Sequence, residues 1–418
     1  MNVLKISRKK RHELLNLPQR VQTLTERLRL QQARSDLLAL NSYLDQRKSN
    51  HPKSFDPVAE LFEQELLRPY NYFGLYPDYP IQTFAHLKYL LRDKKCKFID
   101  TAEREVLPNL FYIWGYRGPA QDILSRALMR DLPVYFFEDP FLRSVCPSVL
   151  RDQTPDLRFI QSIGMTVDDC GCYFDCFHHS RLEMMLNDPR FDLSKEELSR
   201  ARNCITTLVQ NRLSKYNHQP LELPEQIKRQ LDGCHKKSVL IVDQRKGDMS
   251  IYRGGIHDET YRQIITDALR ENPESDIFLK AHPDMLSGKF SGCFNGTELT
   301  RLHLIDCAVN PYALLEQVDL VYTGTSQMGF EALLAGKKVI CYGLPFYAGW
   351  GLTEDRLCST YRTRRRSLEE VFYCAYIAYS HYVDPINRCR CSLERTMDYL
   401  LELREEFFAL RGVRTDGF

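Results

Sequence analysis

The positions of apolar residues along the chain predict two successive regions of alternating strands and helices. In the first region, apolar runs at 110–115 and 133–139 predict buried strands, and the pattern at 118–131 predicts a helix between them. The polar segment 218–226 carries two prolines, and we interpret it as a linker. The predicted strands of the second region are 238–244, 275–284, 301–306, 318–322 and 339–342, with a helix at 258–271.

Apolar spacings of three and four residues predict further helices outside these runs. Such patterns occur within residues 1–50, at 194–213, at 366–383 and at 391–410, whereas 166–175 is typical of a short hairpin. We therefore expect an α/β fold in four parts. These are a basic helical segment at 1–60, an N-terminal α/β lobe at 61–225, a Rossmann-like lobe at 236–365, and C-terminal helices at 366–418 that pack back on the lobes.

Composition and charge narrow the class of protein. Of the 418 residues, 43% are hydrophobic and 27% are charged, as in globular proteins, and the net charge of +2 argues against nucleic acid as a partner. The first 50 residues alone carry +7, so this basic arm could touch anionic lipid or an acidic partner, although a solvated helix face is the commoner explanation. No signal-peptide pattern and no run of about 20 apolar residues is present. We expect a cytoplasmic protein, with peripheral contact to the cytoplasmic face of the inner membrane.

The cysteines give little indication of a metal site. None of the 14 cysteines forms a CxxC pair. The CxC pairs at 170–172 and 389–391 lack further cysteine or histidine ligands at a suitable spacing. We therefore expect reduced, mostly buried thiols and no metal.

The segment 318–351 carries the strongest local pattern. A β-rich run is followed by the small polar residues 323–326, a helical pattern closed by Gly336, and a second short strand. The turn of such a βαβ unit presents backbone N–H groups and hydroxyls at a helix N-terminus, where an anion can bind. The alternative is that Thr325 or Ser326 is an ordinary helix cap.

Polar residues follow several predicted strands, where functional groups of open α/β sheets gather. Lys280 and His282 can donate to a phosphate that Ser326 also binds, and Glu331 on the following helix can hold ribose hydroxyls. The alternatives are a structural histidine before proline and a surface glutamate. No GxGxxG or GxxxxGK[ST] stands at a strand–helix junction, which argues against a dinucleotide oxidoreductase or a P-loop NTPase.

Carboxylates form the second set of candidates. Glycosyl transfer passes through an oxocarbenium-like transition state. A carboxylate can stabilise this state, attack the anomeric carbon, or carry a proton. Their spacing in the sequence leaves the individual roles open. The candidates are Glu138, Asp139, Asp243 and Asp248.

Together these segments resemble the KpsC-type capsule polysaccharide proteins, bacterial β-Kdo transferases that use CMP-Kdo. The similar segments follow the family's order over about 250 residues. They are IWGYR (113–117), FEDPFLRS (137–144), DDCGCYFD (168–175), LSKYN (213–217), VLIVDQRKGDMS (239–250), KAHPD (280–284), TSQMGFEALLAGK (325–337) and GLPFYAGWGLTEDR (343–356).

The resemblance implies a GT-B-like architecture, with two Rossmann-like lobes facing a central cleft. The N-terminal lobe would bind the acceptor and the C-terminal lobe the CMP-sugar. The implied donor-binding residues are His282 and Pro283 for CMP, Lys280, Ser326 and Gln327 for phosphate, Glu331 for ribose, and Arg143 for the Kdo carboxylate.

The resemblance also implies a retaining reaction through a covalent Kdo–aspartate adduct. Asp248 matches the family's nucleophile, Asp243 is the second choice, and Glu138 is the acid/base or electrostatic partner. No cofactor and no metal are implied beyond the donor CMP-Kdo, because cationic groups and a helix N-terminus can neutralise a monophosphate leaving group. The partners would be the nucleotide-sugar and a surface polysaccharide or glycolipid acceptor.

One departure from the family affects the catalytic loop. The family usually reads Glu-Asp-Gly where this chain has Glu138-Asp139-Pro140, and proline fixes φ and removes an N–H. Two other functions therefore stay open. One is a transferase that uses another CMP-ulosonic acid or a UDP-sugar, and the other is a non-catalytic module of capsule assembly.

Overall fold

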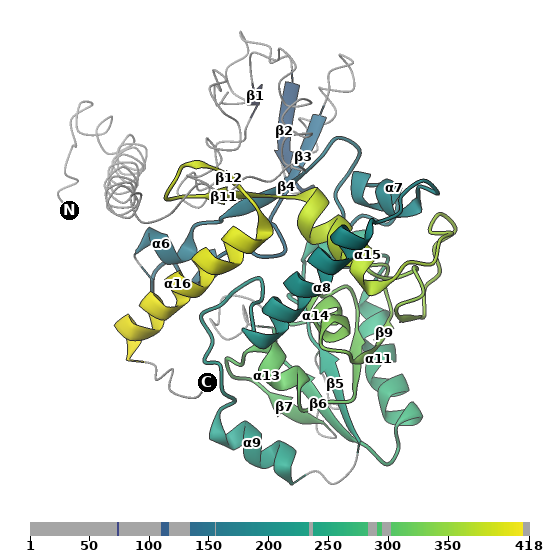
Figure 1. Ribbon diagram of the computed structural model, residues 1–418. Helices are drawn as coiled ribbons and strands as arrows, with labels where there is room; N and C mark the ends of the chain where they lie inside the picture. Colours follow the sequence, from purple (N-terminus) through teal and green to yellow (C-terminus); the bar gives the residue numbers. More distant parts are fainter. Residues whose placement is uncertain are drawn as a thin grey trace, which may run out of the picture.

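The computed structural model describes most of the chain after residue 133 (Figure 1). The helices expected in 1–60, the helix expected at 118–131, and Pro283 lie outside the described residues. The described residues are 73–74, 110–116, 134–154, 156–233, 237–282, 291–294 and 302–412.

A mixed six-stranded sheet forms the upper part of the molecule in Figure 1. β1, β2 and β3 pair in parallel, and each of the other pairs is antiparallel. In spatial order the strands are β1 (Phe73–Gly74), β2 (Leu110–Trp114), β3 (Val134–Glu138), β4 (Gly164–Asp168), β11 (Ser380–Asp384) and β12 (Cys389–Cys391).

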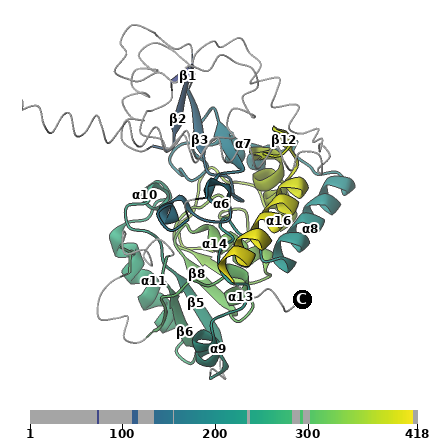
Figure 2. The ribbon, with the colours of Figure 1, turned by 90° about the vertical axis from the view of Figure 1, so that its left-hand side faces the viewer.

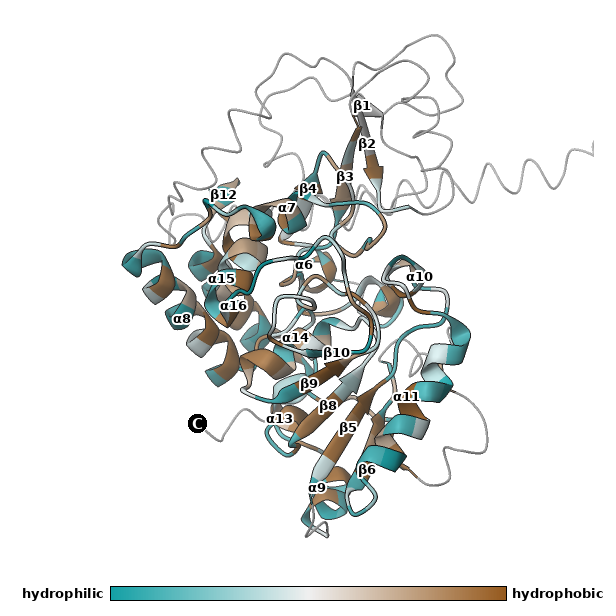
Figure 3. Cartoon of the chain, turned by 90° about the vertical axis from the view of Figure 1, so that its right-hand side faces the viewer, coloured by the Kyte–Doolittle hydropathy of each residue, from teal (hydrophilic) through white to brown (hydrophobic). Residues whose placement is uncertain are grey.

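The second sheet is parallel throughout, and its expected strands are confirmed within a few residues at their ends. Its side chains alternate between two cores. Leu240 and Val242 face one, and Val239 and Ile241 face the other. Burial on both faces explains the continuous apolar runs of these strands (Figure 3). In spatial order they are β10 (Glu354–Asp355), β9 (Lys338–Cys341), β8 (Leu320–Thr323), β5 (Ser238–Val242), β6 (Asp276–Lys280) and β7 (His303–Ile305).

Helices cover both faces of the second sheet. α11 (Asp258–Glu271) packs on β5 and β8, as its apolar spacing predicts. α14 (Gln327–Leu334) packs on β8 and β9 with α13 (Pro311–Leu315) beside it. The short α10 (Met249–Arg253) lies between the two sheets in both Figure 2 and Figure 3.

The remaining helices surround the first sheet or extend from the second. None of the described helices combines the length and apolar composition that crossing a bilayer requires. They are the 3₁₀ turn η3 (Ser148–Leu150), α6 (Leu157–Ile160), α7 (Arg181–Asn187), α8 (Lys195–Gln210), α9 (Glu225–Asp232), α15 (Leu368–Phe372), the π-helical η5 (Tyr373–Tyr379) and α16 (Leu393–Arg411).

Two expected elements differ from the structure. The helix expected over 366–383 ends at Tyr379, and β11 begins at the next residue. The C-terminal segment therefore contributes two strands as well as helices, because β11 pairs with β4, more than 200 residues away in the sequence. The hairpin expected at 166–175 is wrong. β4 ends at Asp168, whose carboxylate accepts the N–H groups of Cys170 and Gly171 and so closes a turn.

One apolar core joins the two sheets. Phe141, which follows β3, packs on Phe346, which follows β9, with ring centroids 4.6 Å apart. It also stacks on Tyr376 at 5.0 Å. The side-chain amide of Gln327 donates to the carbonyl oxygen of Phe141 at 2.8 Å. These contacts fix the end of β3 relative to the start of α14.

Phe141→Ala should test how much this junction stabilises the fold. Phe141 is 1% exposed, so truncation leaves a cavity and should lower the free energy of unfolding by about 3–5 kcal/mol. Urea denaturation measures the loss. Leu410→Ala, at a side chain that is 68% exposed, is the control and should change stability by less than about 0.5 kcal/mol. Equal stability of the two variants would contradict this account.

Candidate functional site

Strand register brings the predicted phosphate-binding residues to one edge of the second sheet. Val242 pairs with Lys280 on one side and with Thr323 on the other. Asp243, His282 and Ser326 follow these positions by one to three residues. β6 and β8 flank β5, and neighbouring strands lie about 4.8 Å apart, so His282 and Ser326 extend from strands about 10 Å apart.

The same edge is a topological switch point. From β5 the chain proceeds through β6 and β7 on one side, and β8, β9 and β10 lie on the other. The connection after β5 therefore leads to one side of the sheet, and the connection after β8 leads to the other. Ligands of open α/β sheets bind in the crevice between two such strands.

The turn after β8 presents the N-terminus of α14 to this crevice. Ser326 caps the helix, and its Oγ accepts the N–H of Met328 at 3.3 Å. The hydroxyl of Tyr347 donates to the Ser326 carbonyl oxygen at 2.6 Å. A Cβ at position 329 would overlap that hydroxyl, so only glycine allows this approach. The Ser326 cap and the anion-site interpretation are compatible, because a serine hydroxyl can accept one hydrogen bond while it donates another.

Gln244 is a site residue that the sequence did not indicate. Its Oε1 accepts the N–H of Thr325 at 2.8 Å, and its Nε2 donates to Thr325 Oγ1 at 3.0 Å. The hydroxyl of Tyr261 donates to the same Oε1 at 3.2 Å. Gln244 therefore ties the end of β5 to the turn before Ser326. A lone glutamine after a strand carries no signal that could have revealed this role.

Lys280 and Glu331 are both buried, and the charge of each affects the pKa of the other. Their exposed fractions are 6% and 3%. Burial lowers the pKa of Lys280 to about 8, against the opposing effect of Glu331 and Asp243. Burial raises the pKa of Glu331, whose Oε1 accepts a hydrogen bond from Ser214 Oγ at 2.6 Å. Lys280 Nζ donates to the Ala281 carbonyl oxygen at 3.3 Å.

The two candidate aspartates differ in their surroundings. Asp243 is 3% exposed, and its Oδ1 accepts the N–H groups of Gln244, Cys293 and Phe294 at 2.7, 3.0 and 3.4 Å. Burial raises its pKa to about 6. Asp243 therefore anchors the segment 291–294.

Asp248 is the more accessible of the two. Its side chain is 36% exposed, and it caps α10 with Oδ1 accepting the Ser250 N–H at 2.9 Å. Its Oδ2 lies 3.6 Å from Nη2 of Arg245. One carboxylate oxygen orients the side chain while the other faces a cation, an arrangement that suits a reacting carboxylate.

Glu138 and Asp139 end β3 in contrasting states. Burial raises the pKa of Glu138 to about 8, with further increases from the negative charges of Asp139 and Asp248, against a decrease from Lys215. Gly115 has a φ of +52°, and a Cβ at this position would overlap the Glu138 carboxylate. The glycine therefore leaves space for that carboxylate. Although burial alone would raise it, Arg143 and Lys215 hold the pKa of Asp139 below its usual value.

The cations beside Asp139 have distinct positions. Arg143 is 2% exposed and donates from Nε to Asp139 Oδ1 at 2.7 Å. Its Nη1 donates to Ser144 Oγ at 3.0 Å and to the Ile160 carbonyl oxygen at 3.1 Å. Lys215 is 27% exposed, and its Nζ lies 3.6 Å from Asp139 Oδ2. Lys215 is the more accessible cation, and the sequence analysis did not single it out.

The two sides of the site are electrostatically connected. The charge of Asp248 is one of the causes that raise the pKa of Glu138, although Glu138 ends β3 of the first sheet and Asp248 follows β5 of the second. α10 carries Asp248 into the space between the sheets (Figures 2 and 3). The structure thus places Asp248 after β5, at the edge that bears His282, Lys280 and Ser326, and its charge acts on Glu138 at the end of β3.

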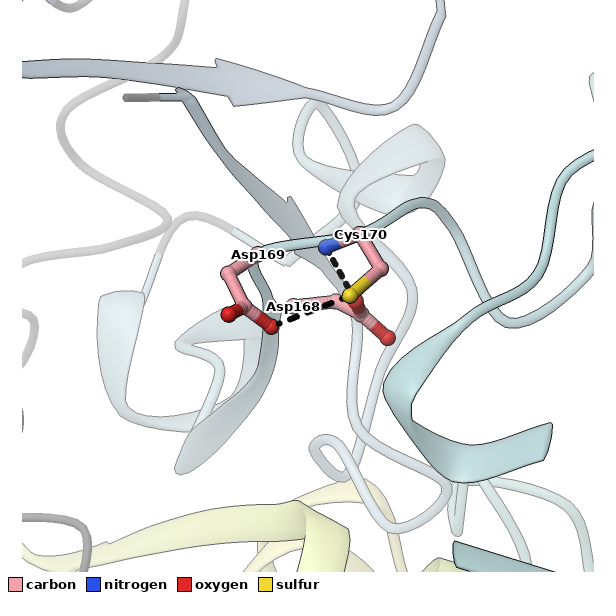
Figure 4. A group of neighbouring side chains, drawn as sticks. All are labelled: Asp168, Asp169 and Cys170. Carbon is pink, nitrogen blue, oxygen red and sulfur yellow. Dashed lines mark hydrogen bonds between the residues drawn. The ribbon is translucent and has the colours of Figure 1, made fainter. Parts of the chain in front are cut away.

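A cluster of possible metal ligands closes a loop elsewhere in the first sheet (Figure 4). It comprises Asp168, Asp169 and Cys170. Oδ2 of Asp168 accepts the N–H of Arg181 at 2.7 Å and the hydroxyl of Tyr379 at 2.8 Å, and its Oδ1 accepts two backbone N–H groups. Asp169 forms a two-point ion pair with Arg181. Because these oxygens are already bonded, the donor set fits a structural turn better than a metal.

A groove of about 590 Å³ runs between α8 and α16. Arg200 and Glu394 line it and bond to each other through Nε–Oε1 at 2.7 Å and Nη2–Oε2 at 3.0 Å. None of the predicted site residues lines this groove. We therefore assign it no ligand.

A family model described as capsule polysaccharide biosynthesis protein matches residues 111–391. The chain belongs to this family. Among curated relatives, the capsule polysaccharide modification protein LipA of Neisseria meningitidis serogroup B is 38% identical over 80% of this chain and 46% of its own length. The lipopolysaccharide-processing protein LpsZ of Rhizobium meliloti is 33% identical over 68% of this chain and 62% of its own length. The chain thus spans about half the length of LipA.

Solved structures confirm the expected GT-B-like architecture and the KpsC-type resemblance. The KpsC β-Kdo 2,4 transferase of Thermosulfurimonas dismutans aligns with a TM-score of 0.70 and 30% identity, over 80% of this chain and 99% of that chain. The β-Kdo 2,7 transferase of the same organism's KpsC aligns with a TM-score of 0.59 and 26% identity, over the same shares of the two chains.

Glu138→Gln should remove one source of pH-dependent stability. The Glu138 carboxyl has an ordinary pKa of 4.5 when unfolded and about 8 when folded. Its stabilising contribution is full below about 4.5 and is lost as the pH rises through about 8. The wild type should therefore lose free energy of unfolding relative to the variant between about pH 5 and pH 8. Urea denaturation at several pH values measures this, and parallel curves would rule it out.

Proposed function

We propose that the chain is a retaining glycosyltransferase that moves Kdo from CMP-Kdo to a surface polysaccharide or glycolipid acceptor. The observation that carries the proposal is the position of α10, which Asp248 caps, between the two sheets and beside the switch point of the second; the charge of Asp248 is also one cause of the raised pKa of Glu138. A nucleophile and a protonated carboxyl on opposite sides of one space are what glycosyl transfer with retention needs. The family and the KpsC structures support the choice of donor.

CMP would bind at the carboxyl edge of the second sheet. His282 and Pro283 would contact the nucleotide, and the Ser326 hydroxyl with the α14 N-terminus would bind its phosphate. The amide nitrogen of Gln327 bonds to Phe141, so Gln327 would act through the shape of the turn. Lys280 and Glu331 are buried, so Lys280 would stabilise the Glu331 carboxylate, which would then face the ribose.

In the first step, the Asp248 carboxylate would attack the anomeric carbon. The bond from that carbon to the phosphate oxygen breaks, its electron pair stays on CMP, and Glu138 donates its proton to the departing phosphate. The product is a Kdo ester on Asp248. An attacking carboxylate divides a difficult displacement into two easier ones.

In the second step, Glu138 would act as the base. Esterification removes the negative charge of Asp248, and that charge contributes to the raised pKa of Glu138. Glu138 therefore holds its proton less tightly and stays ionised once it has lost it. It accepts the proton of the acceptor hydroxyl while that oxygen attacks the anomeric carbon, and the Asp248 carboxylate is released.

A cation must offset the carboxylate that Kdo carries on its anomeric carbon. The sequence resemblance suggests Arg143, but the bonds of Arg143 go to Asp139, Ser144 and Ile160. We therefore propose that Arg143 holds Asp139 in place and that Lys215, the more exposed cation, faces the sugar carboxylate.

Two alternatives remain open to experiment. A different CMP-ulosonic acid or a UDP-sugar would use the same edge, and a non-catalytic module would need none of it. The non-catalytic alternative is disfavoured because Glu138 keeps a raised pKa next to Pro140, and strongly shifted carboxyls cluster at functional sites. Cytoplasmic location and membrane contact through 1–60 stay predictions.

Asp248→Ala should abolish the covalent intermediate. Intact-mass spectrometry after addition of CMP-Kdo should show one Kdo on the wild type and none on the variant. Transfer to a Kdo-terminated acceptor should fall on the order of 10³-fold or more, whereas CMP binding should persist. Asp258→Asn, at an exposed position in α11, is the control and should form the adduct. An adduct that survives Asp248→Ala would show that another residue is the nucleophile.

His282→Ala should weaken nucleotide binding. Loss of a nucleotide contact should raise the Kd for CMP by about 10-fold or more in calorimetry. His303→Ala is the control, because His303 is 48% exposed on β7. The class of donor is tested by measuring how much CMP, UDP and GDP each raise the Tm of the wild type. Stronger stabilisation by UDP than by CMP would favour the UDP-sugar alternative.

A further inference from the structure

Two exposed aromatic residues lie beside the seam between the two halves of the molecule. Phe177 is 62% exposed and Tyr252 is 43% exposed, although large apolar side chains are usually buried. Each is next in the chain to a residue of one backbone hydrogen bond, in which the N–H of Cys176 donates to the carbonyl oxygen of Arg253 at 2.8 Å. Phe177 follows Cys176 on the side of the first sheet, and Tyr252 precedes Arg253 on α10. Each half thus contributes one aromatic residue.

A buried carboxylate bonds to Phe177 and to Arg253, the residue after Tyr252. The Asp175 side chain is 0% exposed, and its Oδ1 accepts the N–H of Phe177 at 2.9 Å. Its Oδ2 accepts Nη1 of Arg253 at 3.3 Å and also pairs with Nδ1 of His178 at 3.1 Å. The Arg253 guanidinium lies 4.4 Å above the ring of Tyr116. These contacts make the exposed pair part of a rigid seam.

Tyr252 lies within one turn of Asp248, the residue that caps α10. Met249 packs against the apolar cluster beneath β2 and β3, and Ile251 is 2% exposed. Asp248 and Tyr252 are instead exposed, at 36% and 43%. One turn of an α-helix rises about 5.4 Å, so a ligand stacked on Tyr252 would lie near the Asp248 carboxylate.

We propose that Phe177 and Tyr252 form a subsite that binds a sugar ring of the acceptor glycan. The C–H faces of a pyranose stack on aromatic rings, and the tyrosine hydroxyl can also bond to sugar hydroxyls. A ring held here presents a hydroxyl to the sugar on Asp248. The inference rests on the proposed function, and it adds a chemical class of ligand and a location for the acceptor.

The test separates acceptor binding from donor chemistry. Phe177→Ala and Tyr252→Ala should each raise the acceptor KM by about 3- to 10-fold with a Kdo-terminated oligosaccharide. Adduct formation and CMP release without acceptor should change by less than about twofold. Phe177→Trp and Tyr252→Phe should restore most of the acceptor affinity, because an aromatic face remains.

Matched controls remove similar exposed apolar area elsewhere. Leu304→Ala on β7, at 45% exposure, and Leu410→Ala on α16, at 68%, should leave the acceptor KM unchanged. Saturation-transfer NMR with the oligosaccharide alone measures binding without any reaction. It should show contact with the wild type and a weaker signal for both alanine variants.

Three outcomes would overturn the proposal. The first is an unchanged acceptor KM and NMR signal in both alanine variants. The second is that the alanine variants lose as much adduct formation as transfer. That result would mean that the two rings only maintain the structure of α10. The third is weaker binding to anionic phospholipid vesicles with unchanged glycan binding, which would assign the rings to a lipid surface. A wild type that binds the oligosaccharide but forms no adduct would instead contradict the proposed function.

Discussion

Packing between the two sheets around Phe141 is the constraint on which the site depends. Phe141 contacts Phe346 and Tyr376, and its carbonyl oxygen accepts the amide of Gln327 at the start of α14. This single region therefore fixes β3, which ends in Glu138, relative to the helix that follows β8. Two sheets that met only through solvent or loops would leave the distance between Glu138 and Asp248 undefined. The aromatic core makes that distance a property of the fold.

Burial and charge then give neighbouring carboxyls opposite properties. Glu138 and Asp139 are consecutive, yet the pKa of Glu138 is raised to about 8 and that of Asp139 is lowered. The two pKa values differ because of position. Asp139 forms ion pairs with Arg143 and Lys215, whereas Glu138 combines burial with the negative charges of Asp139 and Asp248. Titratable groups whose environments separate their pKa values in this way are typical of acid/base sites. Below the carboxyl edge of the second sheet, the opposite charges of Lys280 and Glu331 likewise oppose the effect of burial on the pKa of each group.

Local patterns in the sequence predicted most of the second sheet but only β2 and β3 of the first. The apolar runs there are buried on both faces, so β5, β6, β8 and β9 were recognisable without knowledge of their partners. β11 was not, because its strand character depends on pairing with β4 more than 200 residues away. The site shows the same division. Residues at strand ends were predictable, whereas Gln244, Lys215 and Asp175 act through contacts with distant segments.

The short helix α10 shows why such distant contacts matter for the chemistry. Met249 anchors its first turn in the cluster of the first sheet, and Arg253 ties its last residue to Asp175. On its other side, Thr325 Oγ1 donates to the Ser250 carbonyl oxygen at 3.0 Å, and the absence of a side chain at Gly254 lets Thr325 approach. The helix that carries Asp248 is thus bonded both to the first sheet and to the turn at Ser326. A change in either neighbour would move Asp248 relative to the other, so the geometry of the Ser326 turn and the position of Asp248 are coupled.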